Sequence, residues 1–516
     1  MKARTLTIAL LGAAVAAAVF VPHAARGAGG ARPFVLRRAS DSKSSQPVPS
    51  IFQTASRTCE PDVPLAGANA PEVLGENFDP ANFDEISATR RGRLLAYATT
   101  LSEAGLPGTV KQVVLLPEGP GDTSIRIPKA GSGDNDQPSV QFDDFGYRCV
   151  FRSVAGNGSD IQLYSLTHAG ATDEKATLAV TNVAGGSGRA FDPAFTARVR
   201  TREVAGSVKV KERDAFVAFI SDADLDPRRG NANGAEQLFL WEEQGKVFRR
   251  LTDNLDPQAH LNRPAMDRSG TVIVFESTAD LQPGSVDPLD TSRVGNAGGV
   301  RNLFLWRSGA HPPVRQLTWS DRDCFSPRMD ATGRFVLFSS RGDPLSGANR
   351  ERRFSQIFAV TGLDGGRPRL RQLTQTLAGD NVLPRPGVRV DEFVFWSTAH
   401  PPDAGSKGLP VLLFGRPQEP GAPPPPAQCG PSALLSIHGR VQHVHGYLDV
   451  ENGARLLANP PKNPVITGPP VFSNDPGRIF FATNDFELNP RTAGEPKDES
   501  SSLFALRIAL ATRSAQ

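Results

Sequence analysis

The chain has almost no net charge, because 57 Lys and Arg residues face 54 Asp and Glu residues over 516 positions. Three of the cations, Lys2, Arg4 and Arg26, lie within the first 27 residues, so the remainder is formally neutral. A neutral body without a basic run disfavours nucleic acid or an anionic membrane surface as the main partner.

Cysteine is also scarce, with only Cys59, Cys149, Cys324 and Cys429. None belongs to a CxxC pair, which leaves zinc and thioredoxin-like redox sites without support. In an exported chain four cysteines allow two disulfides, with three possible connectivities. The apolar run YRCVF around Cys149 is equally compatible with a buried free thiol. The sequence leaves the disulfide pairing open.

Only one stretch is long and apolar enough to suggest a membrane segment, at 5–21. It follows Lys2 and Arg4 and precedes Ala25-Arg26-Gly27, which is the order of a cleavable export signal. An uncleaved anchor is the alternative, but a run of about 17 residues is at the lower limit for a bilayer span. We therefore expect a signal peptide at 1–27 and a periplasmic or secreted bacterial protein without a stable membrane anchor.

The abundant residues are Gly (49), Pro (44) and Phe (29), which favour many turns and short strands over long helices. Residues 28–82 show little periodicity and are expected to form a partly disordered lead-in. From residue 83 to residue 510 a repeated pattern predicts one domain.

The repeat is clearest from Asn262 to Thr374, where two copies agree in order, type and spacing. Each copy has a Pro, a turn with Asp and Gly, an apolar strand, a third strand and a closing Leu-Thr. Seven segments align on the apolar strand: RLLAYAT at Tyr97, YRCVFRS at Phe151, AFVAFIS at Phe219, TVIVFES at Phe275, RFVLFSS at Phe338, EFVFWST at Phe395 and RIFFAT at Phe481.

The turn before that strand pairs Asp or Asn with Gly, for example Asp267 with Gly270, which is typical of a tight hairpin. The strand itself is apolar at nearly every position, so it is expected to be buried on both faces, as in a propeller blade covered by two neighbours. The third strand is similar, and the fourth is shorter and more polar, as an outer edge should be. The pattern predicts an all-β propeller of seven four-stranded blades.

The blade number stays open between seven, eight and six, because the residues after the proline-rich stretch could form a further blade and the first copy could fall outside the array. Two copies also depart from the turn pattern. The third copy has Lys211-Glu212-Arg213-Asp214 where the turn glycine is expected, and the sixth has Val390-Asp391. We interpret 417–431, which is rich in proline, as an inserted loop, and the residues after it as strands that complete the sixth blade.

These residues resemble the TolB-like propeller repeats of bacterial exported proteins. Pro264 to Gly270 and Pro327 to Gly333 keep that family's six-residue step, and Leu251-Thr252, Leu317-Thr318 and Leu373-Thr374 keep its closing pair. The departure is at the turn, which lacks the family's Pro-Asp or Ala-Asp directly before Gly. The resemblance implies the propeller fold and leaves the function open, since such blades serve both docking and catalysis.

Two groups of residues have side chains of the kind that bind metal ions. The acidic loop from Ser221 to Gln237, like those from Ser277 and Thr483, lies where calcium could bind, but it lacks the leading and closing Asp of a D-x-N-G-x-x-D pattern. His438, His443 and His445 lie close in sequence. The last two are at strand spacing on one face and could begin a zinc site, but the sequence places no third ligand or general base for them. We therefore expect hydrated loops with Asx turns and solvent-facing histidines, and we assign no metal or cofactor.

Catalytic signatures are missing from the sequence. There is no G-x-S-x-G, and paired carboxylates cannot be chosen among 54 acids. The aromatic residues Trp241, Trp306 and Trp396 are at strand positions typical of core packing. We therefore assign no catalytic residue and predict a non-enzymatic scaffold that binds a protein or peptide through propeller loops or the central funnel. The alternative is a carbohydrate-active lyase or glycosidase with its site in the funnel.

Overall fold

A computed structural model of the chain describes 22 segments, which contain all the elements discussed below. They are 35–37, 72–78, 86–88, 94–101, 107–117, 125–127, 133–143, 146–169, 172–186, 188–204, 208–286, 294–296, 299–344, 354–363, 368–373, 380–386, 393–397, 411–417, 439–445, 471–473, 478–483 and 501–507. Within them, no helix is long and apolar enough to cross a membrane.

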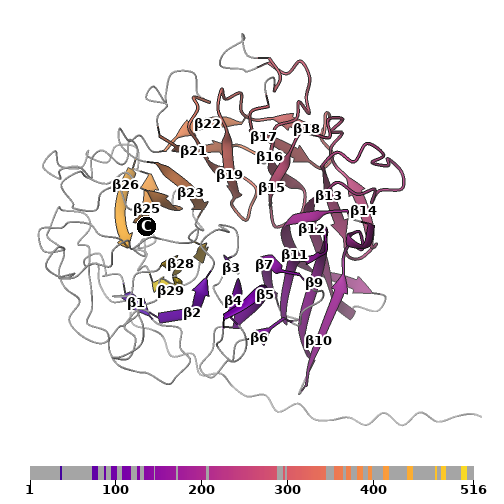
Figure 1. The fold of residues 1–516 in the computed structure, drawn as a ribbon, viewed down its shortest axis with the longest axis vertical. Helices are drawn as coiled ribbons and strands as arrows, with labels where there is room; N and C mark the ends of the chain where they lie inside the picture. The colour runs from indigo at the N-terminus through magenta and orange to yellow at the C-terminus, as the bar shows by residue number, and fades with distance from the viewer. Residues whose placement is uncertain are drawn as a thin grey trace, which may run out of the picture.

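The described strands form seven antiparallel sheets arranged around a central axis (Figure 1). The first three sheets contain β3 (Ile86–Ala88), β4 (Leu94–Leu101), β5 (Pro107–Pro117) and β6 (Ile125–Arg126); β7 (Asn135–Asp143), β8 (Gly146–Ala155), β9 (Gly158–Ala169) and β10 (Thr172–Ala179); and β11 (Ala190–Val204), β12 (Val208–Ser221), β13 (Gln237–Glu242) and β14 (Val247–Arg250). The next three contain β15 (Leu261–Met266), β16 (Val272–Ser277), β17 (Asn302–Arg307) and β18 (Val314–Gln316); β19 (Cys324–Met329), β20 (Phe335–Ser340), β21 (Gln356–Thr361) and β22 (Arg369–Gln372); and β23 (Asn381–Pro386), β24 (Phe393–Ser397), β25 (Val411–Pro417) and β26 (Gly439–His445). The predicted seven-bladed propeller is confirmed.

The seventh sheet joins the two ends of the described chain. Its strands β27 (Val471–Ser473), β28 (Arg478–Thr483) and β29 (Ser501–Arg507) pair in order, and β29 also pairs with β1 (Val35–Arg37) and β2 (Glu72–Phe78). Both N-terminal strands come from the range that the sequence assigns to the lead-in. Strand β26 completes the sixth sheet, as predicted, while residues 418–438, most of the proline-rich insertion, lie outside the described residues.

The second strand carries the aromatic residue of the repeat, and in the fourth and fifth blades it is buried on both faces. Every residue of β16 and of β20 is buried. Within a blade, the aromatic residues of the second and third strands stack, as Phe275 does on Phe304 with ring centroids 6.0 Å apart. Their neighbours pack against the adjacent sheets, so one hydrophobic cluster spans the third and fourth blades and another spans the fourth and fifth. The predicted two-sided burial is therefore correct.

The Asp–Gly turns have the geometry that the sequence predicts. The Oδ1 atom of Asp330 accepts hydrogen bonds from the backbone N–H groups of Arg334 (2.8 Å) and Phe335 (3.0 Å), which begin the next strand. Gly333 has φ of 70°. The same carboxylate contacts recur at Asp267, and Gly270 also has φ of 70°. A short acidic side chain and a left-handed glycine together close these two hairpins.

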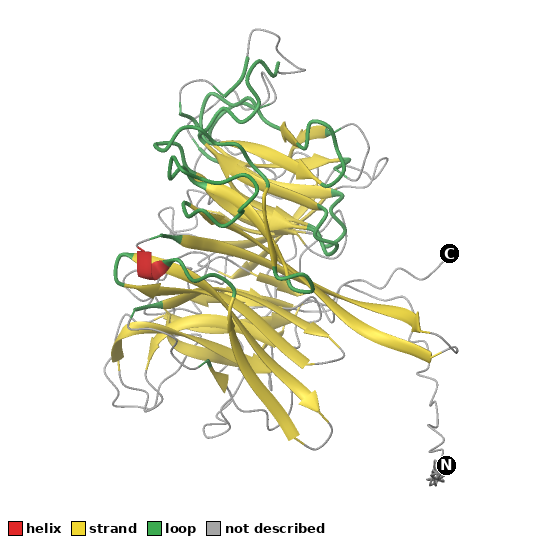
Figure 2. Ribbon diagram, turned by 90° about the vertical axis from the view of Figure 1, so that its right-hand side faces the viewer, coloured by secondary structure: helices red, strands yellow, loops and turns green. Residues whose placement is uncertain are grey.

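The third blade corrects one prediction. Residues 211–214, expected as a turn without glycine, lie inside β12 and pair with β11, with Glu212 opposite Arg200. The two strands run on to Val204 and Val208, so their connection is 205–207 (Ala-Gly-Ser). Figure 2 shows a two-stranded ribbon projecting from the disc on the side opposite η1 (Ala184–Gly186). The copy was misread because its hairpin is longer than those of its neighbours.

Two of the four cysteines are described, and both are buried free thiols. Burial raises the pKa of the Cys149 thiol far above its ordinary value, and burial raises that of Cys324 to about 11. The free-thiol interpretation of Cys149 is thus confirmed, while Cys59 and Cys429 lie outside the described residues. Trp241 and Trp306 are buried in β13 and β17, as expected.

Candidate functional site

The propeller has two faces, which the strand order defines. Because neighbouring strands are antiparallel, each first strand begins at the face that also carries the loops between second and third strands. We call this the entry face. The η1 turn, which connects the second and third blades and is red in Figure 2, lies on it. Most strands cross the thickness of the disc, so residues at equal strand positions lie at equal depth.

The third residue of the innermost strand is unusual in five consecutive blades. These residues have positive φ although none is glycine, and a proline follows each of them; we call them the axial positions. They are Gln137 (φ 51°), Asp192 (51°), Arg263 (49°), Ser326 (55°) and Leu383 (54°). A register shift marks a β-bulge at each one. Left-handed non-glycine residues cost energy, on the order of 1–3 kcal/mol each, and tend to cluster at functional sites.

Four axial positions are linked by hydrogen bonds from blade to blade, and we call these four the axial arc. The Gln137 amide donates to Asp192 Oδ1 at 3.0 Å, while the backbone N–H of Asp192 donates to Gln137 Oε1 at 2.9 Å. The Arg263 N–H donates to Asp192 Oδ2 at 2.8 Å. The Arg263 guanidinium in turn donates to Ser326 Oγ at 3.1 Å. Side chains of the second to fifth blades therefore form one polar chain near the entry face.

Glu276 lies next to the axial arc, on β16, and is fully buried. Its Oε1 atom accepts the backbone N–H of Ser326 at 2.6 Å, and its Oε2 atom forms no hydrogen bond. Guanidinium nitrogens of Arg263 and Arg301 lie 3.8 Å from Oε1 and 3.6 Å from Oε2. Burial raises the pKa of Glu276 above its ordinary value, although the two arginines act in the opposite direction.

Other blades have a residue at the strand position that is equivalent to Glu276, but its type differs from blade to blade. Strand pairing places Arg152, Ile220, Glu276, Ser339 and Trp396 at this register in five successive blades. Arg152 binds Asp136 of its own blade, with Nε 2.7 Å from Oδ1. The scaffold is uniform here, while the chemistry differs from blade to blade.

The acidic loop at 221–237 is held by its own hydrogen bonds. The side-chain amide of Asn231 donates to the carbonyl oxygens of Asp222 and Ala235, both at 2.8 Å. Burial raises the pKa of Asp226, but N–H groups of Arg250 and Arg228 donate to its carboxylate and hold the pKa below its ordinary value. Within the described residues, no group of three or more His, Cys, Asp or Glu could hold a metal ion.

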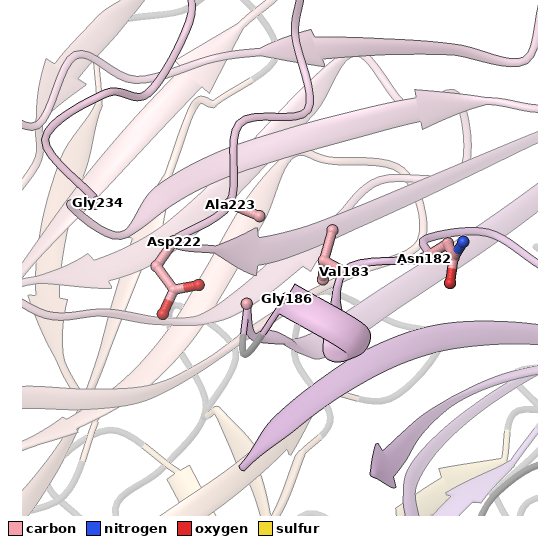
Figure 3. A pocket seen from close by; sticks show the side chains of 7 residues that line it. Asn182, Val183, Gly186, Asp222, Ala223 and Gly234 are labelled. Carbon is pink, nitrogen blue, oxygen red and sulfur yellow. The ribbon is translucent and has the colours of Figure 1, made fainter. Parts of the chain in front are cut away.

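This loop also lines a pocket of about 480 Å³ between the second and third blades. Figure 3 shows Asp222, Ala223 and Gly234 on one side, with Asn182, Val183 and Gly186 on the other. The Asp222 carboxylate accepts the backbone N–H and the guanidinium Nε of Arg189, both at 2.7 Å. The pocket is therefore walled mostly by backbone and small residues.

The remaining sequence candidates are not brought to this site by any described contact. His443 and His445 lie in β26, where pairing shifts register between Leu412 and Leu413. His438 and the loop after Thr483 lie outside the described residues. The loop after Ser277 is held in the same way as the loop at 221–237: the side-chain amide of Asn296 donates to the carbonyl oxygens of Ser277 and Ala279.

Sequence reasoning missed the axial positions, although a signal for them exists. Pro264 and Pro327 repeat in the sequence, and the axial positions are the residues directly before them. Proline disfavours the right-handed helical region for the residue before it. An X-Pro pair recurring at the start of each first strand, with X different each time, could have located these positions.

No protein-family model and no curated protein sequence matches the chain. Among solved structures, it is similar to an oligogalacturonate lyase from Vibrio parahaemolyticus (12% identity, 84% of this chain, 90% of that chain, TM-score 0.42). It is also similar to an oligogalacturonate lyase in complex with manganese (12%, 92% and 98%, TM-score 0.41) and to the Dos1 propeller (10%, 83% and 94%, TM-score 0.38).

Proposed function

We propose that this chain is an exported, TolB-like propeller that binds a protein or peptide at the axial arc and performs no chemistry. The observation that supports it is the contrast between backbone and side chains at the axial positions. The backbone geometry is the same in five blades, whereas the side chains are Gln, Asp, Arg, Ser and Leu. A uniform scaffold requires no such variety, and recognition of an asymmetric partner does.

The arc is also preorganised for binding. Its side chains are fixed by hydrogen bonds across three blade boundaries, from Gln137 to Ser326. Groups held in place before binding lose little conformational entropy when a partner arrives. The left-handed backbone at each position is a cost that the surrounding structure offsets, as is common at binding and catalytic sites.

The enzymatic alternative is a lyase or glycosidase with Glu276 as the acid. It is favoured by one observation, the raised pKa of a carboxyl group flanked by Arg263 and Arg301. The burial of Glu276 weighs against it, since a general acid must come within hydrogen-bond reach of its substrate. Binding is therefore the better supported function.

Two histidines of the fourth blade allow a matched crosslinking experiment in native cells. His260 precedes β15 on the entry face, and His311 lies between β17 and β18 on the opposite face; both are exposed. A photo-crosslinking amino acid at position 260 is expected to capture a partner that the same residue at position 311 does not. Asp192→Asn, which tolerates positive φ but removes the charge, should reduce that capture.

Equal capture from both positions, or none from either, would contradict the proposal. Turnover of an oligosaccharide by the purified protein, lost in Glu276→Gln, would instead establish the enzyme. Periplasmic or secreted localisation, with cleavage of the signal peptide, is checked by fractionation and N-terminal sequencing of the mature chain.

A further inference from the structure

A second concave site lies on the face opposite the axial arc, between the third and fourth blades. Its volume is about 470 Å³, within the range of about 300–1,000 Å³ that is typical of small-molecule sites. Its rim is formed by the turn between β13 and β14, the turn between β15 and β16 and the start of the connection from β17 to β18. These connections all lie away from the entry face, because they join first to second or third to fourth strands. We call this site the opposite-face pocket.

The floor of this pocket differs from the equivalent place between the second and third blades. Phe216, three residues before the aromatic residue of its repeat, corresponds to Arg148 in the second blade. Arg148 is buried, and its Nη1 donates to Oε2 of Glu243 in the next blade at 2.9 Å. There, an ion pair spans the two blades. Between the third and fourth blades, the same place has the ring of Phe216, which carries no polar group.

The apolar part of the pocket is a narrow strip. Phe216, Leu240 and Trp306 line it, belong to one hydrophobic cluster, and are 8%, 2% and 4% exposed. Because the hydrophobic contribution scales with the apolar area removed from water, a wholly apolar ligand would gain little from so small a strip. The ligand that fits is therefore mostly polar, with one apolar side.

Three neutral side chains at the pocket can bind the polar part of a ligand. Among the described residues, Gln244, Trp306 and Ser308 form no side-chain hydrogen bond. The indole N–H of Trp306 is not one of the buried atoms without a partner, so it reaches solvent, and Trp306 lines this pocket. The pocket thus offers an indole donor, an amide with both donors and an acceptor, and a hydroxyl group.

The charged side chains of the pocket already have partners. Arg249 donates to Oε1 of Glu242 at 2.5 Å. Asp214 is buried and interacts with another group of the protein. A charged ligand would lose hydration here without meeting an unpaired opposite charge, whereas an uncharged ligand does not incur this cost.

We propose that the opposite-face pocket binds one ring of an uncharged sugar. A pyranose has C–H groups on its faces and hydroxyl groups around its edge. It can therefore cover the strip of Phe216, Leu240 and Trp306 while its hydroxyl groups bind the neutral side chains at the pocket. The site is separate from the axial arc, so this inference goes beyond the proposed function and does not depend on it.

Saturation-transfer NMR titrations of sugars into the purified protein, in sugar-free buffer, test the ligand chemistry. The probes are the methyl glycosides of glucose, galactose, mannose and N-acetylglucosamine, compared with glucuronic acid and glucosamine. At least one neutral glycoside is expected to bind, and to bind more tightly than either charged sugar.

Two variants and two matched controls locate the site. Trp306→Phe removes the N–H but keeps an aromatic ring, and Gln244→Ala changes an exposed turn residue. Each should weaken binding about threefold to tenfold, the loss expected for one hydrogen bond. Trp241→Phe, at the same strand position one blade earlier, and Gln258→Ala, exposed on the entry face, should leave the affinity unchanged.

Weaker binding confined to Trp306→Phe and Gln244→Ala would support the proposal. Absence of binding by all four neutral glycosides would overturn it, and so would a preference for glucuronic acid or glucosamine. Binding that both pocket variants retain would place the sugar elsewhere, and an equal loss in Trp241→Phe would assign the effect to packing; either result overturns the site. The crosslinking experiment detects a protein partner at the entry face, so its failure and the failure of this inference are distinguishable.

Discussion

Glu276 offers a direct test of the electrostatics beside the axial arc. Glu276→Ala removes the acceptor of the Ser326 N–H, and Ser326 is itself only 2% exposed. An unsatisfied buried donor costs about 1–3 kcal/mol, and each lost buried methylene about 0.8 kcal/mol. With one methylene beyond Cβ, we expect Ala to lower the free energy of unfolding by about 2–4 kcal/mol. Glu276→Gln keeps the shape and the acceptor, so its cost should be below about 1 kcal/mol.

The two variants also differ from the wild type in pH dependence. Because burial raises the pKa of Glu276 above its unfolded value of 4.5, the native state holds a proton that the unfolded state releases. The stability of the wild type therefore falls as pH rises from about 4.5 towards the native pKa, and this contribution is constant above it. Gln carries no such proton, so Glu276→Gln should gain stability relative to the wild type over that interval.

Urea unfolding followed by tryptophan fluorescence from pH 5 to pH 9 measures this difference, because titrations common to both proteins cancel. Ser339→Ala is the control, since Ser339 occupies the same strand position one blade later and does not ionise there. A wild-type-minus-Gln difference that does not change with pH would refute the reasoning. So would a Gln variant as unstable as the Ala variant.

Three further predictions concern the scaffold. Asp330→Ala should lower the unfolding free energy by about 2–4 kcal/mol, and Asp330→Asn by less, because Asn keeps an acceptor for the Phe335 N–H; equal losses in urea unfolding would contradict this. Gly270→Ala should lower the melting temperature, since its Cβ would lie 2.8 Å from the Phe216 ring at a φ of 70°, whereas Gly186→Ala should not, because nothing lies within 4 Å of its Cβ. Cys149 and Cys324 should resist alkylation at pH 8 until the protein unfolds, as mass spectrometry of the two peptides would show; rapid labelling of the native protein would disprove their burial.

The sequence predicts the parts of the blade that depend on short-range patterns. Asp330 and Gly333 lie three residues apart, so their turn can be predicted from neighbouring residues alone. The apolar run that ends at Phe338 likewise predicts a strand buried on both faces. The length of the β11–β12 hairpin was not predictable in this way, because the pairing of Glu212 with Arg200 depends on contacts along a strand that no neighbouring blade repeats.

The candidate site escaped sequence reasoning for a different physical reason. Arg263, Asp192 and Ser326 are more than 60 residues apart in sequence, and only closure of the propeller brings their strands together. Each is an ordinary polar residue when considered alone. The pattern that unites them is a backbone conformation, and a residue's φ is visible in sequence only through the proline that follows it.

The separation of structural and functional residues follows from this arrangement. In the fourth and fifth blades, Asp267 and Asp330 occupy the same turn position and accept the same backbone hydrogen bonds. Both are Asp because the same backbone geometry requires the same type of side chain. At the register of Glu276 the backbone requirement is also shared, yet the next blade carries Ser339. When equivalent backbone positions carry chemically different side chains, packing alone does not determine which residue is there. The same contrast at the axial positions is why the proposed binding site is placed there and not on the repeated turn motif.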